Sequence, residues 1–167
     1  MREEHIGGLR TRVTGGTDGK GGGNGPVVIL LHGFGAPGND LVPLADVMDV
    51  PVGTRWFFPE GPLSLSFGPS DARAWWIIDM ARIAADQAAG RVRDLSQDIP
   101  KGLAPARETM LVFLKEVEHK FGADPRKTIL GGFSQGAMLS CDLMLRTTQP
   151  YAGLIQLSGT LLAAQEW

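Results

Sequence analysis

The sequence is poor in several features that would place it in a particular class of protein. It has a single cysteine, Cys141, so no disulfide can form within the chain, and this fits a reducing compartment. The longest clear apolar run, VVILL at 27–31, has the length of one strand and is far too short to cross a bilayer. The start of the chain, MREEHIGGLR, lacks the hydrophobic region of a secretory signal. We therefore expect a cytoplasmic protein without membrane insertion.

A strong excess of charge is also missing. The formal net charge of −2 gives no reason to expect nucleic acid as a partner. Three scattered histidines and one cysteine lack the spacing of metal ligands, so no metal site is predicted. The glycine-rich stretch 15–26 is not a phosphate-binding loop, because Lys20 is followed by Gly21 where that motif needs serine or threonine. We interpret this stretch as a flexible hairpin connection between strands.

The chain does contain enough apolar residues for one core. Its 167 residues are 43% hydrophobic and 20% charged, which predicts a single domain over 1–167. Strands are predicted at 9–14, 26–33, 54–61, 127–132 and 151–159, and helices at 40–48, 79–89, 104–122 and 135–146. This alternation predicts the α/β class, with a mostly parallel sheet covered by helices on both faces.

One short segment, LGGFSQGAML at 130–139, carries the pattern of a catalytic serine. Ser134 stands between Gly132 and Gly136, after a predicted strand and before a predicted helix. A nucleophile elbow requires this order of strand, tight turn and helix, and only glycine at the two flanking positions avoids collision with nearby backbone. The alternative is an ordinary structural turn in a glycine-rich chain.

A second segment, LLHGFGA at 30–36, follows an early predicted strand. Acyl transfer builds negative charge on the carbonyl oxygen, and two backbone N–H groups usually stabilise it. In hydrolases of this type one donor follows the nucleophile and the other lies in the loop after an early strand. This places the candidate donors at Phe34 and Gln135; the alternative is a glycine turn that merely closes the strand.

Apolar side chains gather in the weakly ordered stretch after Pro62. They are Leu63, Leu65, Phe67, Trp75 and Trp76. Each could simply belong to the core. Together they could form the wall of an apolar substrate site, and we take Leu63, Trp75 and Trp76 as candidate substrate-binding residues.

Four segments, LLHGFGA, FPEGP, RAWWIID and GGFSQGAML, occur in an order and spacing that resembles the phospholipase/carboxylesterase family. These small α/β-hydrolases include acyl-protein thioesterases and bacterial carboxylesterases. The resemblance implies an α/β-hydrolase fold, a nucleophile at Ser134, and an oxyanion hole formed by the N–H groups of Phe34 and Gln135. It places Trp75 and Trp76 near the acyl-binding groove and implies no cofactor. Glu60 and Gly61 differ from the residues of many members, so substrate specificity does not carry over.

A serine nucleophile also needs a base, which is normally a histidine oriented by an acid. In this fold both follow the serine, yet only Asp142 and Glu166 do so here, and no histidine follows at all. His5 precedes the first predicted strand, and His119 belongs to the helix that leads to the far edge of the sheet, about 17 Å away. His32 lies at the correct edge, but we interpret it as holding the oxyanion loop. We therefore expect the C-terminally truncated part of a hydrolase, with the acid and the base beyond Trp167.

The leading hypothesis is a serine carboxylic-ester hydrolase that acts on a small acyl ester or thioester. The alternative is a non-catalytic domain that binds an apolar ligand, and acyl transfer by the same serine is a third option. The predicted strand at 153–157 would be an exposed edge, which readily pairs with another chain. We accordingly expect association through this strand, either as a homodimer or with a separate C-terminal fragment.

Overall fold

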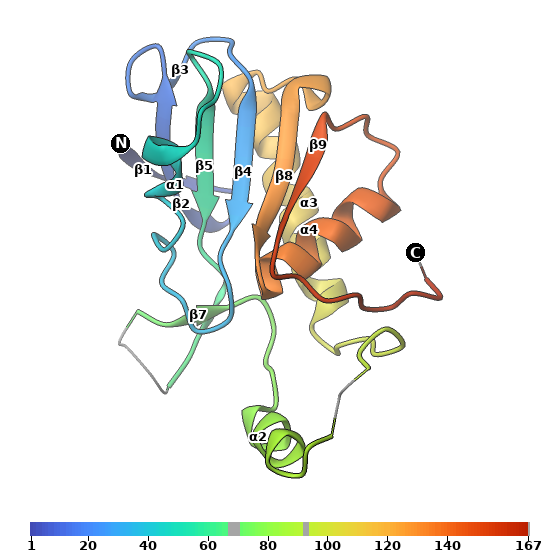
Figure 1. Cartoon of the computed structure of the whole chain (residues 1–167). Helices are drawn as coiled ribbons and strands as arrows, with labels where there is room; N and C mark the ends of the chain where they lie inside the picture. Colours follow the sequence, from blue (N-terminus) through green and yellow to red (C-terminus); the bar gives the residue numbers. More distant parts are fainter. Residues whose placement is uncertain (67–70, 92–93, 167) are drawn as a thin grey trace.

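The computed structural model describes residues 1–66, 71–91 and 94–166, and its center is one mixed β-sheet (Figure 1). The strands run in the order β1-β2-β5-β4-β8-β9, with β3 paired to β2. Their bounds are β1 Arg2–Ile6, β2 Leu9–Gly16, β3 Lys20–Gly22, β4 Val27–Leu31, β5 Arg55–Pro59, β8 Thr128–Phe133 and β9 Gly153–Leu157. A separate small pair consists of β6 Leu63–Ser64 and β7 Arg73–Ala74. The strands β5, β4, β8 and β9 are mutually parallel, as the sequence predicts.

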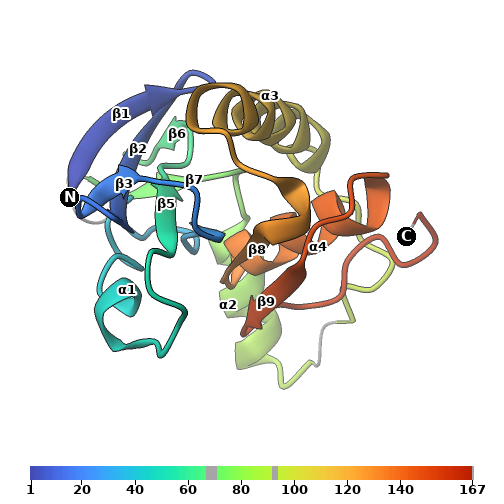
Figure 2. The same ribbon diagram turned by 90° about the horizontal axis from the view of Figure 1, so that it is seen from above.

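The helices cover both faces of this sheet (Figure 2). α3 (Leu103–Phe121) and α4 (Gln135–Arg146) pack on one face, and the short α1 (Leu44–Val47) lies on the other. α2 (Met80–Ala88) lies beyond the carboxyl ends of the parallel strands (Figure 1). None of the described helices is long and apolar enough to span a membrane.

The uniformly apolar β4 is explained by this double cover. Val27, Ile29 and Leu31 belong to the core under α3 and α4, whereas Val28 and Leu30 belong to the core on the α1 side. Successive side chains of a strand point to opposite faces, so a strand with both faces covered needs no polar alternation. α3 shows the complementary pattern, since its apolar stripe is buried and Gly122 ends it in the left-handed conformation at φ 57°.

Two parts of the N-terminal region differ from the prediction. β1 was not predicted, so His5 lies within a strand rather than before the first one. A Gly7–Gly8 turn with φ 56° and 81° joins β1 to β2, as a two-residue hairpin requires. The stretch 15–26 is not a hairpin connection either, because β5 lies between β2 and β4, and β3 forms within that stretch.

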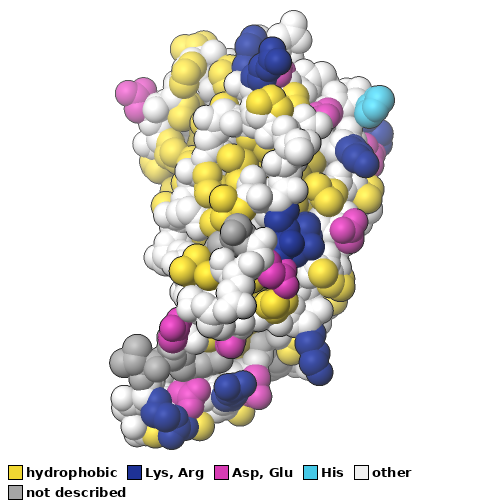
Figure 3. Space-filling model, turned by 90° about the vertical axis from the view of Figure 1, so that its right-hand side faces the viewer, with side chains coloured by type: hydrophobic (Ala, Val, Ile, Leu, Met, Phe, Trp, Pro, Cys, Tyr) yellow, Lys and Arg dark blue, Asp and Glu magenta, His cyan; other side chains and the backbone are white. Residues whose placement is uncertain are grey.

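β9 occupies one edge of the sheet. It pairs in parallel with β8, and in the described part of the chain it has no second strand beside it. Figure 3, turned to face the right-hand side of Figure 1, shows hydrophobic side chains spread over this flank between charged groups.

Candidate active site

Ser134 lies in the sharp turn between β8 and α4, at the carboxyl edge of the parallel strands. Its backbone has φ 50° and ψ −112°, and its N–H donates to the Leu157 carbonyl at 2.8 Å. A positive φ is uncommon for a residue other than glycine, and it persists only where the surroundings enforce it. The turn presents a partly exposed serine at the start of a helix, in the order of strand, turn and helix that the predicted nucleophile elbow requires.

The flanking glycines are required by contact with neighbouring backbone. A Cβ on Gly132 would lie 2.6 Å from the Gly136 carbonyl carbon, and a Cβ on Gly136 would overlap the Leu31 carbonyl group. Real Cβ atoms do not approach so closely. The steric reason for two glycines around Ser134 is therefore confirmed.

The loop 32–38 runs beside Ser134, and we call it the oxyanion loop after the donor that the sequence predicts at Phe34. It follows β4, which pairs with β8 from Val27–Thr128 to Leu31–Gly132. A Cβ built on Gly33 would lie 3.5 Å from the Ser134 Cβ. Two hydrogen bonds fix the middle of the loop, from the Gly35 N–H to the Arg73 carbonyl at 2.8 Å and from the Arg73 N–H to the Ala36 carbonyl at 3.1 Å.

His32 holds the start of this loop. Its side chain is only 2% exposed, and its Nε2 accepts the Gly61 N–H at 2.8 Å. The other ring nitrogen, Nδ1, lies 2.8 Å from the Gly33 carbonyl, so it carries the proton and donates it. Burial lowers the pKa of His32, which keeps the ring neutral. Because both nitrogens are engaged, His32 has a structural role here, as expected, and does not serve Ser134 as a base.

The Gln135 side chain ties the elbow to the segment that contains the two tryptophans. Its Oε1 accepts the Trp75 N–H at 2.9 Å, and its Nε2 donates to the Trp76 carbonyl at 2.8 Å. Trp75 in turn donates its indole N–H to the His32 carbonyl at 3.0 Å. No pattern in the sequence links Gln135 with residues so far away, and sequence reasoning missed this role.

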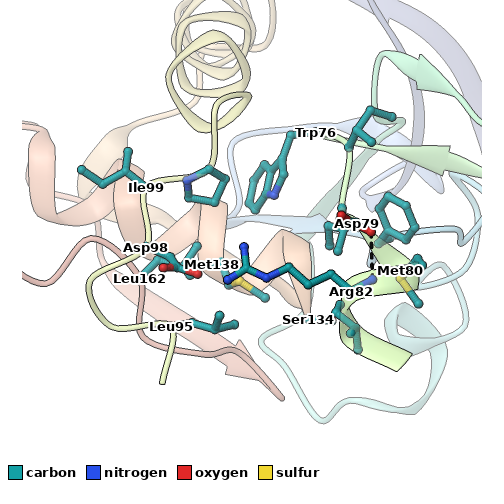
Figure 4. A pocket seen from close by; sticks show the side chains of 15 residues that line it. Trp76, Asp79, Met80, Arg82, Leu95, Asp98, Ile99, Ser134, Met138 and Leu162 are labelled. Carbon is teal, nitrogen blue, oxygen red and sulfur yellow. Dashed lines mark hydrogen bonds between the residues drawn. The ribbon is translucent and has the colours of Figure 1, made fainter. Parts of the chain in front are cut away.

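A pocket of about 600 Å³ opens beside Ser134 (Figure 4). Its walls come from the oxyanion loop, the segment leading into α2, α2 itself, residues 95–100, α4 and the segment near the C-terminus. Its lining is largely apolar and comprises Phe34, Trp76, Ile77, Ile78, Met80, Ile83, Leu95, Ile99, Pro100, Met138 and Leu162, together with Ser134, Asp79, Arg82 and Asp98. Figure 4 shows the Arg82 side chain extending from α2 into this space.

The pocket unites some of the predicted residues and leaves others out. Ser134, Phe34 and Trp76 line it, and Gln135 follows directly as the first residue of α4. Trp75 is 2% exposed and belongs to the framework behind the pocket. Leu63 is 37% exposed on β6 and does not line the pocket. Leu65 is buried in a small cluster with Ala72 and Ala74, and Phe67 lies outside the described residues.

Sequence reasoning missed the wall formed by α2 and residues 95–100. A signal was present, because the large apolar side chains Ile77, Met80 and Ile83 recur at a spacing of three residues across the start of α2. Backbone hydrogen bonds from Ala163 to Asp98 at 3.1 Å and from Ala164 to Ser96 at 2.7 Å attach the C-terminal segment to this wall.

The two acids that follow Ser134 are engaged in ion pairs elsewhere. Asp142 is fully buried and accepts hydrogen bonds from Arg107 and Arg146, and Arg146 also pairs with Glu166. Asp142 stands eight residues after Ser134, a rise of about 12 Å along α4. These acids connect α3, α4 and the C-terminal segment.

The remaining histidines lie away from Ser134. His5 is on β1, which three strands separate from β8, or about 19 Å across the sheet. His119 is exposed in the last turn of α3. In the described part of the chain, no histidine is placed to accept the Ser134 proton.

Comparison with known proteins places this geometry in a family. The model of the phospholipase/carboxylesterase family matches residues 20–167. Acyl-protein thioesterase 1 of Cryptococcus neoformans var. neoformans serotype D is 30% identical over 134 residues, covering 78% of this chain and 52% of that protein. Acyl-protein thioesterase 1 of Candida albicans is 28% identical over 139 residues, covering 79% and 55%. The chain thus spans about half the length of the curated relatives it matches.

Solved structures show the same architecture. Esterase PE8 superposes with a TM-score of 0.73 at 29% identity, covering 95% of this chain and 66% of its own. A carboxylesterase from Mesorhizobium loti gives a TM-score of 0.70 at 19% identity, covering 97% and 68%. The mostly parallel sheet with helices on both faces is therefore an α/β-hydrolase fold, and the chain belongs to the phospholipase/carboxylesterase family.

Proposed function

We propose that the protein is a serine carboxylic-ester hydrolase with Ser134 as its nucleophile. The observation that carries this proposal is the position of Ser134, held at φ 50° in a strand–turn–helix and opening into an apolar pocket beside Phe34. A buried or fully paired serine would not support it. Family membership and the names of the relatives point to the same class of reaction.

The chemistry follows from the placement of the groups. The Ser134 Oγ attacks the substrate carbonyl carbon, and the resulting oxyanion accepts hydrogen bonds from the N–H groups of Phe34 and Gln135. The tetrahedral species expels the alcohol or thiol, and water then releases the acyl group. The Oγ proton requires a base, which the proposal assigns to a group outside the described residues.

The substrate class follows from the pocket. Its volume of about 600 Å³ lies within the range of small-molecule sites. Its apolar walls suit the acyl part of an ester or thioester, and the relatives named acyl-protein thioesterase agree with this class. No cofactor is needed for this reaction.

A second function, non-catalytic binding of an apolar ligand, is favoured by one observation. Asp142 and Glu166 are held in ion pairs, and His32 is neutral with both nitrogens bonded. The same pocket could then hold an acyl chain without turnover.

Labelling with a fluorophosphonate probe tests the proposal, in parallel with hydrolysis of a short p-nitrophenyl ester. When the missing acid and base are supplied, wild type should label and hydrolyse, and Ser134→Ala should lose both. Ser64→Ala, which removes an exposed serine from β6, is the matched control and should behave as wild type. If wild type and Ser134→Ala behave identically while a fluorescent fatty acid still binds, the binding function replaces the catalytic one.

A further inference from the structure

Glu60 is a buried carboxylate beside the oxyanion loop, and it pairs with three arginines. It directly follows β5 and is only 6% exposed. Its carboxylate lies 3.0 Å from an Arg12 Nη1 and 2.8 Å from an Arg73 Nη2, with Arg10 at 4.0 Å. Burying a carboxylate removes its hydration, so a buried carboxylate persists only where partners compensate for the lost water.

The partners of Glu60 are the residues that hold the loop. Arg73 makes both backbone hydrogen bonds to the middle of the oxyanion loop, at Gly35 and Ala36. The ion pair with Glu60 therefore fixes the side chain of the residue whose backbone fixes the loop.

The end and the start of the loop also contact Glu60, its partner Arg12, or the adjacent Gly61. A Cβ on Gly38 would lie 2.6 Å from the Glu60 Oε2 and 2.7 Å from the Arg12 Nη1, so the loop end packs directly on the ion pair. The Gly61 N–H, one residue later, donates to His32 at the loop start. Residues 60 and 61 thus contact the oxyanion loop at both ends.

We propose that Glu60 is a positioning residue for the oxyanion hole. It does not line the pocket, and it acts through Arg73 and Gly38 to set the place of the Phe34 N–H relative to Ser134. The inference rests on the proposed function of Phe34. A displacement of about 1 Å at such a donor is expected to cost on the order of a hundredfold in rate.

Glu60→Gln tests the proposal, since it keeps the size of the side chain and removes its charge. Glu4→Gln, at an exposed ion pair with Arg2 on the neighbouring β1, is the matched control. In the full chain, amide hydrogen exchange of residues 32–38 should become at least about tenfold faster in Glu60→Gln, because the loop opens more often, while exchange in α3 stays unchanged. Exchange in the loop at the wild-type rate would overturn the proposal.

Two further readouts separate positioning from general stability. In Glu60→Gln, fluorophosphonate labelling of Ser134 should slow about tenfold or more, because the phosphoryl oxygen of the probe needs the aligned N–H donors. A fluorescent fatty acid should bind the pocket with unchanged affinity. Arg73→Gln should reproduce both effects, and the double variant should add no further loss. An equal loss of labelling and of fatty-acid binding would overturn the positioning role.

Failure of the two proposals can be told apart. If Ser134→Ala labels like wild type, the catalytic function fails, but hydrogen exchange of the loop still reports on Glu60. If Glu60→Gln does not fold, Arg73→Gln carries the same exchange measurement, and an unchanged loop in that variant counts against the proposal.

Discussion

Gly136, in the first turn of α4, packs so closely on the end of β4 that its position has no room for a side chain. Gly136→Ala would drive a methyl group into the Leu31 carbonyl, and we expect it to lower the free energy of unfolding by about 1–3 kcal/mol or more. Gly153→Ala is the control, because its Cβ would lie an ordinary 3.8 Å from the Ile129 Cγ1. Urea unfolding of the two variants measures the difference, and equal stabilities would contradict the packing described above.

His32 makes the stability of the protein depend on pH. Burial lowers the pKa of its imidazole below the ordinary 6.5, so the unfolded state binds a proton more readily than the folded state does. The stabilising contribution of neutral His32 is therefore complete above about pH 6.5 and is lost as the pH falls toward the lowered pKa.

This pH dependence can be measured by urea unfolding at a series of pH values. His32→Gln should flatten the fall of stability below pH 6.5, because it removes the titrating ring and leaves an oxygen that can accept the Gly61 N–H. A variant that keeps the full acid slope of wild type would show that other groups cause it.

At the scale of elements, one buried carboxylate joins α3 to α4. Asp142 is fully buried between Arg107 and Arg146, whose side chains are 17% and 25% exposed. Asp142→Asn removes the carboxylate that pairs with the Arg107 guanidinium and leaves Arg146 paired with Glu166, and we expect a loss of about 3–5 kcal/mol of unfolding free energy. Glu4→Gln, at a pair with 38% exposure on each side, should cost no more than about 1 kcal/mol. Chemical unfolding of both variants decides this, and similar losses would contradict the prediction.

The elements that sequence reasoning predicted share strong local signals. β4 is a continuous apolar run, α3 carries an apolar stripe ended by glycine, and the elbow has glycines on both sides of its serine. Each of these signals lies within one short segment, so the sequence of that segment is enough to predict the element. β1 was missed because its continuous run of charged and polar residues, REEH at 2–5, resembles a polar terminus, although the Gly7–Gly8 hairpin turn was visible.

The pocket was less predictable because tertiary contacts form it. Trp75 and Trp76 are adjacent and identical, yet Trp76 lines the pocket and Trp75 is buried behind it. Hydrogen bonds of Gln135 to the backbone of both tryptophans set this division, and sequence spacing alone does not contain that information. The Asp142 and Glu60 ion pairs likewise join segments that no local pattern connects.

At the scale of the whole molecule, β9 offers backbone groups along an edge of the sheet. We expect the 167-residue chain to self-associate through residues 153–157, because a parallel strand with one neighbour readily pairs with another chain. Light scattering should report a mass above 17.9 kDa that rises with concentration, and amide exchange in β9 should slow with it. A monodisperse mass of 17.9 kDa at every concentration would rule this out.

The pocket walls come from stretches that lie far apart along the chain, namely the loop at Phe34, α2 with the nearby residues 95–100, and the segment around Leu162. A molecule that fills the pocket therefore bridges these stretches, and filling the pocket is thermodynamically linked to folding. At a ligand concentration of 100 times Kd, this linkage raises the unfolding free energy by about 2.7 kcal/mol. The melting temperature therefore reports how far a ligand fills the pocket, even where the ligand is not hydrolysed. Across a series of acyl compounds of increasing length, the upward shift of the melting temperature should grow until the acyl group is longer than the space between these walls. The length at which the shift stops growing measures the longest acyl group that the pocket holds.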